Sequence, residues 1–442
     1  MHQPNTAIRF IVTLLLAGAT LVAFGCAGGG GGGTTGGGPA IQAPTPTPTP
    51  KPVSCLLAHL MHATAAWVAP RPSKPAAITT KIGPGPARRV CGYAGPGQMR
   101  CMAWKRTDLA LSPPVNPPGY GPADLQAAYN LPSQANGTFQ TVAIVDAFDD
   151  PNAESDLAFY RTTFSLPPCT TANGCFLKVN QDGATSPLPS TDPSPCSSPQ
   201  GCWEEEEALD LDMVSAVCPN CHIVLVEANG QNGAGDLYVA ENSAAQKCAA
   251  TEISNSWNGA EYPGEQNDDV NFNHPGVPIT FASGDSGYPG GYPTASTLVT
   301  AVGGTTLSNA GKATQTETAW LDSGALCSRY IAQPSWQSNV PTVVNNPGVC
   351  TMRINNDVSA VGDPNTGVAV YTTFGGDPGW LVFGGTSVST PIIAAVYALA
   401  GNGASIHDGS YSYSHTSSLT DIFAGSITPC PSGSPNYTGT YV

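Results

Sequence analysis

Short hydrophobic runs recur along the chain after residue 119, and mixed or polar stretches separate them. The runs at 141–145, 222–227, 278–282 and 297–302 are mostly apolar and rich in Val, Ile, Leu and Ala, which is typical of strands buried on both faces of a sheet. A longer hydrophobic stretch at 390–400 follows a Gly-rich turn and predicts a helix with Pro391 in its first turn. Strands that alternate with helices predict an α/β domain built on an open parallel sheet.

The N-terminus has the pattern of an export signal. Arg9 precedes an apolar run that ends at Phe24 and is too short to span a membrane comfortably, so residues 1–26 are predicted to direct export. Gly25 before Cys26 resembles a bacterial lipobox, in which the cysteine is lipidated after cleavage. This predicts a lipid anchor on Cys26, with simple secretion as the alternative.

Two further segments precede the domain. Residues 27–52 consist of a Gly run followed by Thr-Pro repeats, which predicts a tether without a core of its own. Residues 53–118 are Pro-rich and more basic, and we interpret them as a short pro-segment or as an ordered lead-in. The main domain is then predicted at 119–442.

The charge of the chain disfavours two classes of partner. The sequence has 31 acidic and 16 basic residues, and its formal net charge is −15. No excess of Lys and Arg is available to neutralise phosphates, which disfavours nucleic acid and anionic lipid surfaces. A chain with so few cations loses most of its charge when its carboxylates protonate, which fits an enzyme that works at low pH. We expect a monomer that acts outside the cytoplasm.

Fourteen cysteines indicate an oxidising compartment. Cys218 and Cys221 have the spacing of a zinc knuckle, but no second pair of that spacing follows and no His pair lies near them. Structural disulfides are therefore the favoured interpretation, and their connectivity stays open. The neighbouring cysteines are Cys169 with Cys175, Cys196 with Cys202, Cys218 with Cys221, and Cys327 with Cys350.

The strongest chemical motif is a Gly-rich turn that leads into the apolar helix. It places Ser387 after Gly385 and Thr386, close to a predicted helix N-terminus. Glycines permit a tight turn and close substrate approach, and the helix dipole stabilises negative charge nearby. A capped helix without chemistry is the alternative. The segment is also similar to the serine motif of the subtilisin clan.

A nucleophilic serine needs a base, and the histidines of this chain do not supply one. The seven histidines, none of which lies in a His-Gly-Thr-type segment, are His2, His59, His62, His222, His274, His407 and His415. In the expected place stands an acidic predicted helix at 203–213, on which Glu206 and Asp210 are four residues apart and share one face. Two such carboxyl groups hold a proton to higher pH and can act as base and orienter in acid. The alternative is a solvated acidic helix start, and we expect Glu204, Glu205, Glu207 and Asp212 to be of that kind.

Asp285 follows a predicted strand and lies among small residues from Ser283 to Gly287. A protonated Asp at a strand end can donate a hydrogen bond to a developing oxyanion. An Asp in a Gly-rich turn, with no chemical role, is the alternative.

In this order and spacing, the three elements resemble the sedolisin (serine-carboxyl peptidase) family over most of residues 119–422. The resemblance implies a subtilisin-like α/β fold with a mostly parallel seven-stranded sheet flanked by helices. It also implies that the chain hydrolyses protein or peptide substrates. The implied roles are Ser387 as nucleophile, Glu206 as general base and acid, Asp210 as its partner, Asp285 as oxyanion donor, and Asp146 and Trp257 as a supporting network.

The family also carries a C-terminal calcium site that begins with an Asp-Ile or Asp-Val pair, and Asp421 with Ile422 resembles that start. The later segment with a second Asp ligand is not found before Val442, which predicts an incomplete calcium site or a truncated chain. Two other functions stay open at this point. One is a subtilisin-type peptidase with an unrecognised histidine, and the other is an inactive peptidase-fold binding protein at the cell surface.

Overall fold

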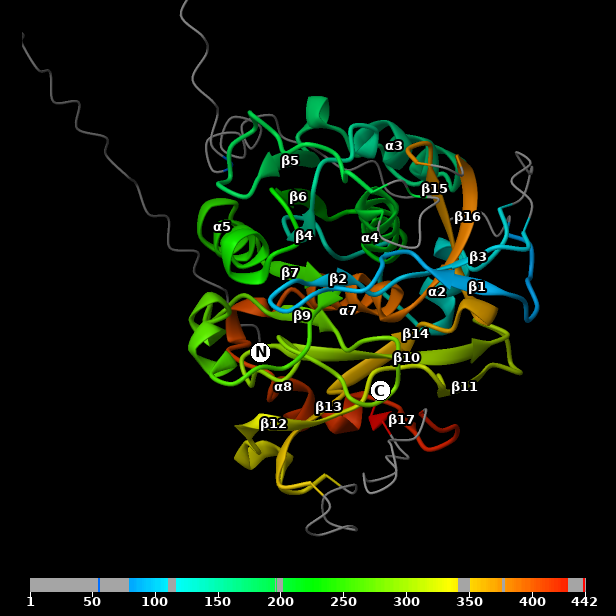
Figure 1. Ribbon diagram of the computed structural model, residues 1–442. Coiled ribbons are helices and arrows are strands. Elements are labelled where there is room, and N and C mark those ends of the chain that lie inside the picture. Colours follow the sequence, from blue (N-terminus) through cyan, green and yellow to red (C-terminus); the bar gives the residue numbers. More distant parts are fainter. Residues whose placement is uncertain are drawn as a thin grey trace, which may run out of the picture. The chain divides into compact units, whose positions relative to one another are not determined.

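In the computed structural model, a sheet of parallel strands forms the centre of the domain (Figure 1). Among the described residues, seven strands pair in parallel, which confirms the expected mostly parallel sheet. Strand β11 (Thr316–Ala319) adds an antiparallel eighth strand at the end of β10. The parallel strands lie in the order β5 (Phe176–Asn180), β6 (His222–Ala228), β4 (Thr141–Ala147), β7 (Glu252–Asn255), β9 (Ile279–Ala282), β10 (Thr300–Ser308) and β14 (Val358–Val361).

The structure describes residues 55, 79–109, 117–194, 196, 202–340, 350–375, 378–427 and 440–441. They all belong to one compact unit, Lys51–Val442. The predicted export signal, the lipid site at Cys26 and the tether up to residue 52 lie outside the described residues. So do parts of the predicted segment at 53–118.

Helices cover both faces of the sheet. Helix α4 (Trp203–Val217) packs against α7 (Thr386–Ala400), and α5 (Tyr238–Lys247) packs on β4 and β6. Figure 1 shows α4 and α5 on opposite sides of those strands. Every residue of α4 is buried, so this helix is an interior layer rather than a surface element. The shorter helices are α2 (Pro122–Ala128), α3 (Ala153–Thr163) and α8 (Tyr411–Ser414).

Helix α7 begins at Thr386, four residues before the predicted start at residue 390. Ser387 therefore lies in the first helical turn, and Pro391 lies beyond the first turn in which we expected it. Because proline has no N–H, Pro391 cannot bond the carbonyl oxygen of Ser387 four residues earlier. Ser256 Oγ lies 3.3 Å from that oxygen, and its one hydroxyl hydrogen is shared between this oxygen and Asp210 Oδ1 at 2.8 Å.

A second, antiparallel sheet joins the lead-in to the domain. It has the order β1 (Ala87–Arg89), β3 (Trp104–Arg106), β16 (Gly379–Gly384) and β15 (Val368–Thr372). Between β1 and β3, strand β2 (Arg100–Cys101) pairs with β8 (Trp257–Asn258). The described part of the predicted pro-segment or lead-in thus packs on the domain. The remaining strand pairs are β12 (Leu326–Ala332) with β13 (Met352–Asn355) and β17 (Asp421–Ile422) with β18 (Thr440–Tyr441).

The described residues contain six disulfides, as the cysteine count predicts. Cys218 is bonded to Cys221, so the alternative of a zinc site at this pair is wrong. Two long-range or loop-closing bonds were not visible in the sequence, namely Cys55–Cys248 and Cys91–Cys101. The others are Cys169–Cys175, Cys196–Cys202 and Cys327–Cys350.

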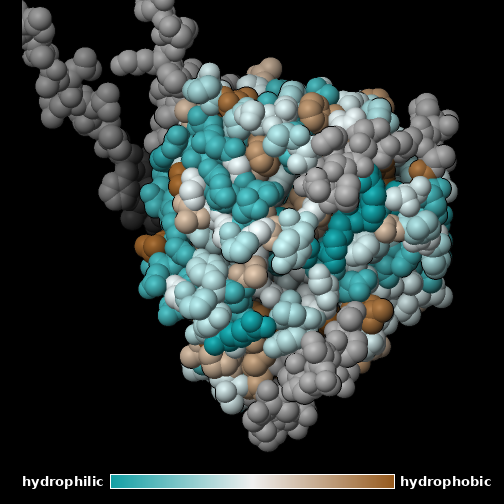
Figure 2. All heavy atoms as spheres, in the orientation of Figure 1, coloured by the Kyte–Doolittle hydropathy of each residue, from teal (hydrophilic) through white to brown (hydrophobic). Residues whose placement is uncertain are grey.

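The surface carries scattered hydrophobic residues. On the face in Figure 2, hydrophilic residues dominate and strongly hydrophobic ones form isolated spots. Large exposed hydrophobic side chains such as Tyr93 and Phe139 are far apart in sequence. In the part of the chain that the structure describes, no helix has the length and hydrophobicity needed to cross a membrane.

A buried ion pair connects β13 to strand β10 of the central sheet. Arg353 bonds Asp357 through two N–H···O contacts of 2.7 and 2.6 Å, and both side chains are buried. Asp357 Oδ2 also accepts the N–H of Ala301 in β10, at 2.7 Å. The pair therefore holds β13 against the strand that runs beside β9.

We predict that Arg353→Met lowers the free energy of unfolding by about 3–5 kcal/mol, because Asp357 is left as a buried carboxylate without its cation. Urea unfolding at fixed pH measures the effect. The double variant Arg353→Met/Asp357→Leu is the control and should recover most of the loss. A single variant as stable as the parent would contradict the prediction.

Candidate active site

Ser387 lies at the end of a turn that only glycine can make. Gly385 has a φ of +100°, and a side chain there would collide with the carbonyl oxygen of Met102. The backbone N–H of Ser387 donates to that same Met102 oxygen at 3.0 Å. The Ser387 hydroxyl lies 3.1 Å from the carbonyl oxygen of Ser256 and accepts the N–H of Met102 at 3.0 Å. The serine is therefore in direct contact with a peptide unit of its own chain.

Glu206 lies behind the serine on α4 and is fully buried. Burial raises its pKa well above the ordinary value, and the neighbouring carboxyl groups of Asp210 and Asp146 raise it further. Ser387 is close enough for its hydroxyl to lower the pKa of Glu206 in part, although neither Glu206 oxygen has a hydrogen bond of ordinary geometry. The carboxyl group that approaches the serine thus holds its proton more tightly than an exposed one.

Asp210 lies one helical turn from Glu206 and is also fully buried. Its Oδ1 accepts a hydrogen bond from Ser256 Oγ at 2.8 Å. Burial raises the pKa of Asp210 well above its ordinary value, with a smaller contribution from Asp146. At the end of β4, burial raises the pKa of Asp146 to about 8, and neither of its oxygens has a partner. Three carboxyl groups that are not exposed to solvent are thus brought together.

Trp257 lies beside this cluster but does not bond its carboxyl groups. Its indole N–H donates to the carbonyl oxygen of Val145 at 2.8 Å, one residue before Asp146. It therefore braces the end of β4. Its ring packs edge-on against Phe281 of β9, with centroids 4.8 Å apart.

Asp285 follows β9 and faces the same turn from the other side. Its Oδ1 accepts hydrogen bonds from the N–H and the hydroxyl of Thr386, both at 2.8 Å. Its Oδ2 is buried without a partner and lies next to Cα of Gly385, where the Met102 oxygen also lies. Burial raises the pKa of Asp285 to about 6, although Arg89, Thr386 and Arg100 oppose the shift. The free oxygen is therefore available as a donor when the group is protonated.

A sequence model of the subtilase family matches residues 190–412, just over half of the chain. The match includes every site residue described above except Asp146, namely Glu206, Asp210, Trp257, Asp285 and Ser387. The chain belongs to the subtilase family. It is 30% identical to kumamolisin from Bacillus sp. (strain MN-32) over 313 residues, which cover 65% of this chain and 53% of kumamolisin. The chain thus spans about half the length of that relative.

Among solved structures, the chain is similar to Pseudomonas sedolisin, a serine-carboxyl proteinase complexed with two molecules of pseudo-iodotyrostatin. The TM-score is 0.57 at 23% sequence identity, and the match covers 73% of this chain and 92% of that chain. This likeness confirms the subtilisin-like fold. The kumamolisin match agrees with the resemblance to the sedolisins that the motifs predict.

The other acidic residues of α4 are not solvated, and the expectation for them is wrong. Each is at most 1% exposed, because strands and helices cover every side of α4. Glu205 forms an ion pair of 2.6 Å with Lys105 of β3. Asp212 accepts the N–H of Tyr371, and Glu204 accepts the N–H of Asp192, both at 2.9 Å. Burial and Glu227 raise the pKa of Glu207 well above its ordinary value.

The structure describes four histidines, of which His407 is exposed. His222 is the first residue of β6 and pairs with Thr141 at the start of β4. Asp146 pairs with Glu227 near the other end of the same two strands. His274 contacts the carbonyl oxygen of Asn271 at 3.0 Å. His415 contacts Ser414 and Tyr411. None of these contacts leads to the serine, so the described residues give no support to a histidine-based subtilisin mechanism.

The predicted calcium ligands form β17, where Asp421 pairs with Tyr441 and Ile422 with Thr440. Within the described ranges, Asp421 belongs to no cluster of three His, Cys, Asp or Glu side chains that could hold an ion. The cluster that does exist there consists of Cys196, Cys202 and Glu204, and its two sulfurs are bonded to each other. The described residues therefore do not complete a calcium site, and calcium stays a prediction.

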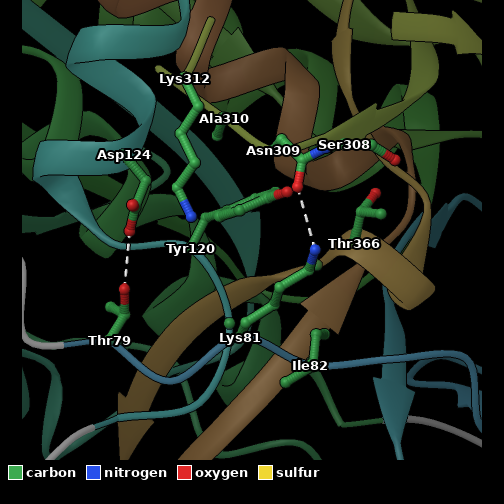
Figure 3. Close-up of a pocket in the computed structure, with 12 residues that line it drawn as sticks. Thr79, Lys81, Ile82, Tyr120, Asp124, Ser308, Asn309, Ala310, Lys312 and Thr366 are labelled. Atoms are coloured by element: carbon green, nitrogen blue, oxygen red, sulfur yellow. Dashed lines mark hydrogen bonds between the residues drawn. The ribbon is translucent and has the colours of Figure 1, made fainter. Parts of the chain in front are cut away.

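A small cavity of about 110 Å³ lies between the lead-in and the domain, and none of the site residues lines it (Figure 3). Two contacts of the lead-in cross it or border it. Lys81 Nζ donates to Asn309 Oδ1 at 3.0 Å, and Thr79 Oγ1 donates to Asp124 Oδ2 at 2.7 Å. The cavity is thus a gap left where the lead-in docks, and it is not the catalytic cleft.

The buried carboxyl groups predict an acid-stable protein. Their folded pKa values are raised, for example to about 8 for Glu241 and to about 7 for Asp150 and Glu252. The folded state therefore holds protons that the unfolded state releases near pH 4. The contribution of these groups to the free energy of unfolding is fully present below that pH and is lost as pH rises towards 8.

We predict that the free energy of unfolding falls between about pH 4 and pH 8, and that Glu241→Gln makes this fall shallower. The removed slope is at most about 1.4 kcal/mol per pH unit for one proton. Urea unfolding across this pH range measures it. The exposed Asp182→Asn is the matched control and should leave the slope unchanged, whereas a parent whose stability rises over this range would refute the analysis.

Proposed function

We propose that this chain is a serine-carboxyl endopeptidase that hydrolyses peptide bonds of proteins in acid. The observation that carries the proposal is the contact of Ser387 with a peptide unit, with buried Glu206 and Asp210 directly behind the serine. Burial of these carboxyl groups costs folding free energy, and an inactive binding protein would have no use for them. The similar fold of Pseudomonas sedolisin, a serine-carboxyl proteinase, agrees with the proposal.

In the proposed reaction, Glu206 is the ionised member of the cluster while its neighbours hold the shared proton, and it takes the hydroxyl proton of Ser387 as Oγ attacks the carbonyl carbon of the substrate. The C–N bond then breaks, and Glu206 returns the proton to the leaving amine. Water hydrolyses the resulting ester by the same route. Asp210 holds the proton that the cluster needs, because burial and mutual repulsion prevent these carboxyl groups from all ionising.

The oxyanion of the tetrahedral intermediate would be stabilised by two donors. One is the backbone N–H of Ser387, which already bonds a peptide carbonyl oxygen at 3.0 Å. The other is protonated Asp285, whose accepting oxygen is occupied by Thr386 and whose second oxygen is free. A pKa of about 6 makes this donor available in acid and removes it at neutral pH.

The proposed substrate is a polypeptide that binds at Ser387 in an extended conformation, as the chain's own strand β2 does. Strand β2 lies just before Met102, the residue that contacts Ser387, and pairs with β8. Beyond Met102 the chain continues into β3, which pairs with β16. A cleft that admits main chain on both sides of the serine favours endopeptidase over exopeptidase action. The disulfides agree with a proposed location outside the cytoplasm, and the lipid anchor on Cys26 and a role for calcium stay predictions.

We predict that Ser387→Ala and Glu206→Gln each lower kcat on an unfolded protein substrate by roughly 10⁴-fold or more, because each removes a member of one catalytic unit. Peptide products at pH 3–5, with and without added calcium, are quantified by mass spectrometry. Ser389→Ala is the matched control, since Ser389 is equally buried on the same helix and bonds only the Thr386 oxygen at 2.9 Å. Parental rates for Ser387→Ala would refute the proposal.

We predict that activity falls as pH rises through about 6, where Asp285 ionises. Asp285→Ala should lower kcat by about 10²–10³-fold in acid and by less above pH 6, where the parent has lost the same donor. Asp285→Asn should retain more activity, because an amide can keep the Thr386 contacts and still donate. The pH dependence of kcat separates the variants. If Asp285→Asn keeps the same fall near pH 6 as the parent, another group is responsible for it.

A further inference from the structure

A second group of buried carboxyl groups lies beside the catalytic ones, between α4 and the central sheet. Its members are Glu207 of α4, Glu227 of β6 and Asp150 just before α3, and none of the three is exposed to solvent. We call these three residues the second carboxyl cluster. Figure 1 shows α3 and α4 on the same side of β4, β5 and β6, away from α5. The proposed reaction leaves this cluster without a role.

The register of the sheet joins the second carboxyl cluster to the catalytic carboxyl groups. Asp146 of β4 pairs with Glu227 of the neighbouring parallel strand β6. Paired residues of adjacent strands point to the same face of the sheet, and adjacent strands lie roughly 4.8 Å apart. Asp146 also lies close enough to Glu206 and Asp210 to raise the pKa of both. It therefore belongs to the surroundings of both clusters.

Glu207 connects the two clusters from the side of the helix. It follows Glu206 directly on α4, and neither of its oxygens has a hydrogen-bond partner in the described part of the chain. Burial raises its pKa well above the ordinary value. Four neighbouring carboxyl groups raise it further, namely those of Glu227, Asp150, Asp146 and Glu204. Because no donor compensates a charge at Glu207, these groups must share protons to stay buried together.

The second carboxyl cluster meets the surface at Lys178 of β5. Lys178 Nζ lies 3.2 Å from Glu227 Oε1 and forms an ion pair of 2.5 Å with Asp149, and the side chains of Lys178 and Asp149 are 17% and 16% exposed. Glu227 Oε1 also accepts the N–H of Asp150 at 3.3 Å, and Asp150 Oδ1 accepts that of Asn152 at 2.8 Å. A negative charge in this cluster is therefore favoured at Glu227 and Asp150 rather than at Glu207.

The surroundings of the second carboxyl cluster are mainly acidic. Burial raises the pKa of Glu227 to about 9, although Lys178 opposes the shift. The charged groups that face the cluster are Lys178, Asp146, Asp149, Asp156 and Glu204, and Asp192 borders Glu204. Lys178 is the one cation among these groups, so it does not balance the charge of several ionised carboxylates.

We propose that the second carboxyl cluster acts through Asp146 on Glu206 and Asp210, and that it sets the pH range in which the catalytic carboxyl groups carry one negative charge. This inference rests on the proposed function, in which Glu206 is ionised while its neighbours keep a proton. A negative charge in the second carboxyl cluster makes every further ionisation beside it less favourable. Both the first and the second ionisation of the catalytic groups are thus moved to higher pH. Glu207 and Glu227 are positioning residues, because they act on the reaction only through Asp146.

The pH dependence of kcat tests the proposal. Glu207→Gln and Glu227→Gln should each move both limbs of the profile to lower pH by about one unit, because each removes a carboxyl group that repels charge on Asp146. Rates on an unfolded protein substrate are measured between about pH 2 and pH 8. All chains also carry Asp285→Asn, which removes the titration of Asp285 from the profile.

Glu241→Gln is the matched control for the loss of a buried carboxyl group. Glu241 is as fully buried as Glu207, and neither of its oxygens has a partner in the described part of the chain. It lies on α5, on the other side of the sheet, and burial rather than a neighbouring carboxyl group raises its pKa to about 8. Its replacement should leave both limbs in place. Glu207→Asp keeps a carboxyl group and should restore the parental limbs.

Proton occupancy is measured without catalysis in the full chain carrying Ser387→Ala. Infrared difference spectra between about pH 3 and pH 9 follow the carbonyl band of protonated carboxyl groups. The part of the band that Glu206→Gln removes belongs to Glu206. Glu207→Gln should lower the pH midpoint of that part by about one unit, whereas Glu241→Gln should not move it. Thermal unfolding shows that each variant is folded.

The outcomes separate this proposal from the proposed function. Limbs and midpoints that stay in place in Glu207→Gln and Glu227→Gln, or that move to higher pH, would overturn the role of the second carboxyl cluster and leave the peptidase proposal intact. An equal movement in Glu241→Gln would overturn it as well. A lowered midpoint of Glu206 together with no hydrolysis by any folded chain, the parent included, would support the link between the clusters and refute the peptidase function.

Discussion

The rest of the site depends on one constraint, namely that carboxyl groups are buried together where water cannot solvate their charge. Glu206, Asp210 and Asp146 lie in one cluster, and none of the hydrogen bonds that the structure gives to them comes from a cation. Full ionisation of such a cluster is too costly, so protons must serve as the counter-charge. The helix that carries the first two residues can be stable in this position only if those protons are retained.

This constraint determines the chemistry that the fold can support. A carboxyl base that shares protons with its neighbours is effective only in acid, and protonated Asp285 is a donor only in acid. Both requirements are met at the same edge of the sheet, because β4, β7 and β9 run parallel and end at that edge. The Gly385 turn then brings Ser387 to the place where the two groups converge.

Much of the fold and of the candidate site could be predicted from the sequence. Each prediction that was wrong or missing depends on packing between residues that lie far apart in sequence. Gly-rich turns and apolar runs are local signals, so the parallel sheet, the Ser387 turn and the one-face spacing of Glu206 and Asp210 could be predicted. The burial of Glu205 could not, because Lys105 lies a hundred residues away in sequence. The contact of Met102 with Ser387 joins segments 285 residues apart, and no local pattern encodes it. The predicted start of α7 was wrong because proline usually lies in the first turn of a helix. Here Pro391 lies further along the helix, and Ser256 Oγ bonds the carbonyl oxygen of Ser387, for which the proline has no N–H.

The same acid dependence extends to the lead-in strands that contact the site. The ion pair of Lys105 with Glu205 requires an ionised carboxylate, and the guanidinium groups of Arg89 and Arg100 attract ionised Asp285 more strongly than the protonated form. Linkage is reciprocal, so protonation of Asp285 weakens the attraction of these two guanidinium groups of the lead-in to the site. The charge contacts of Asp285 with the lead-in are therefore weakest under the conditions in which Asp285 is protonated as a donor.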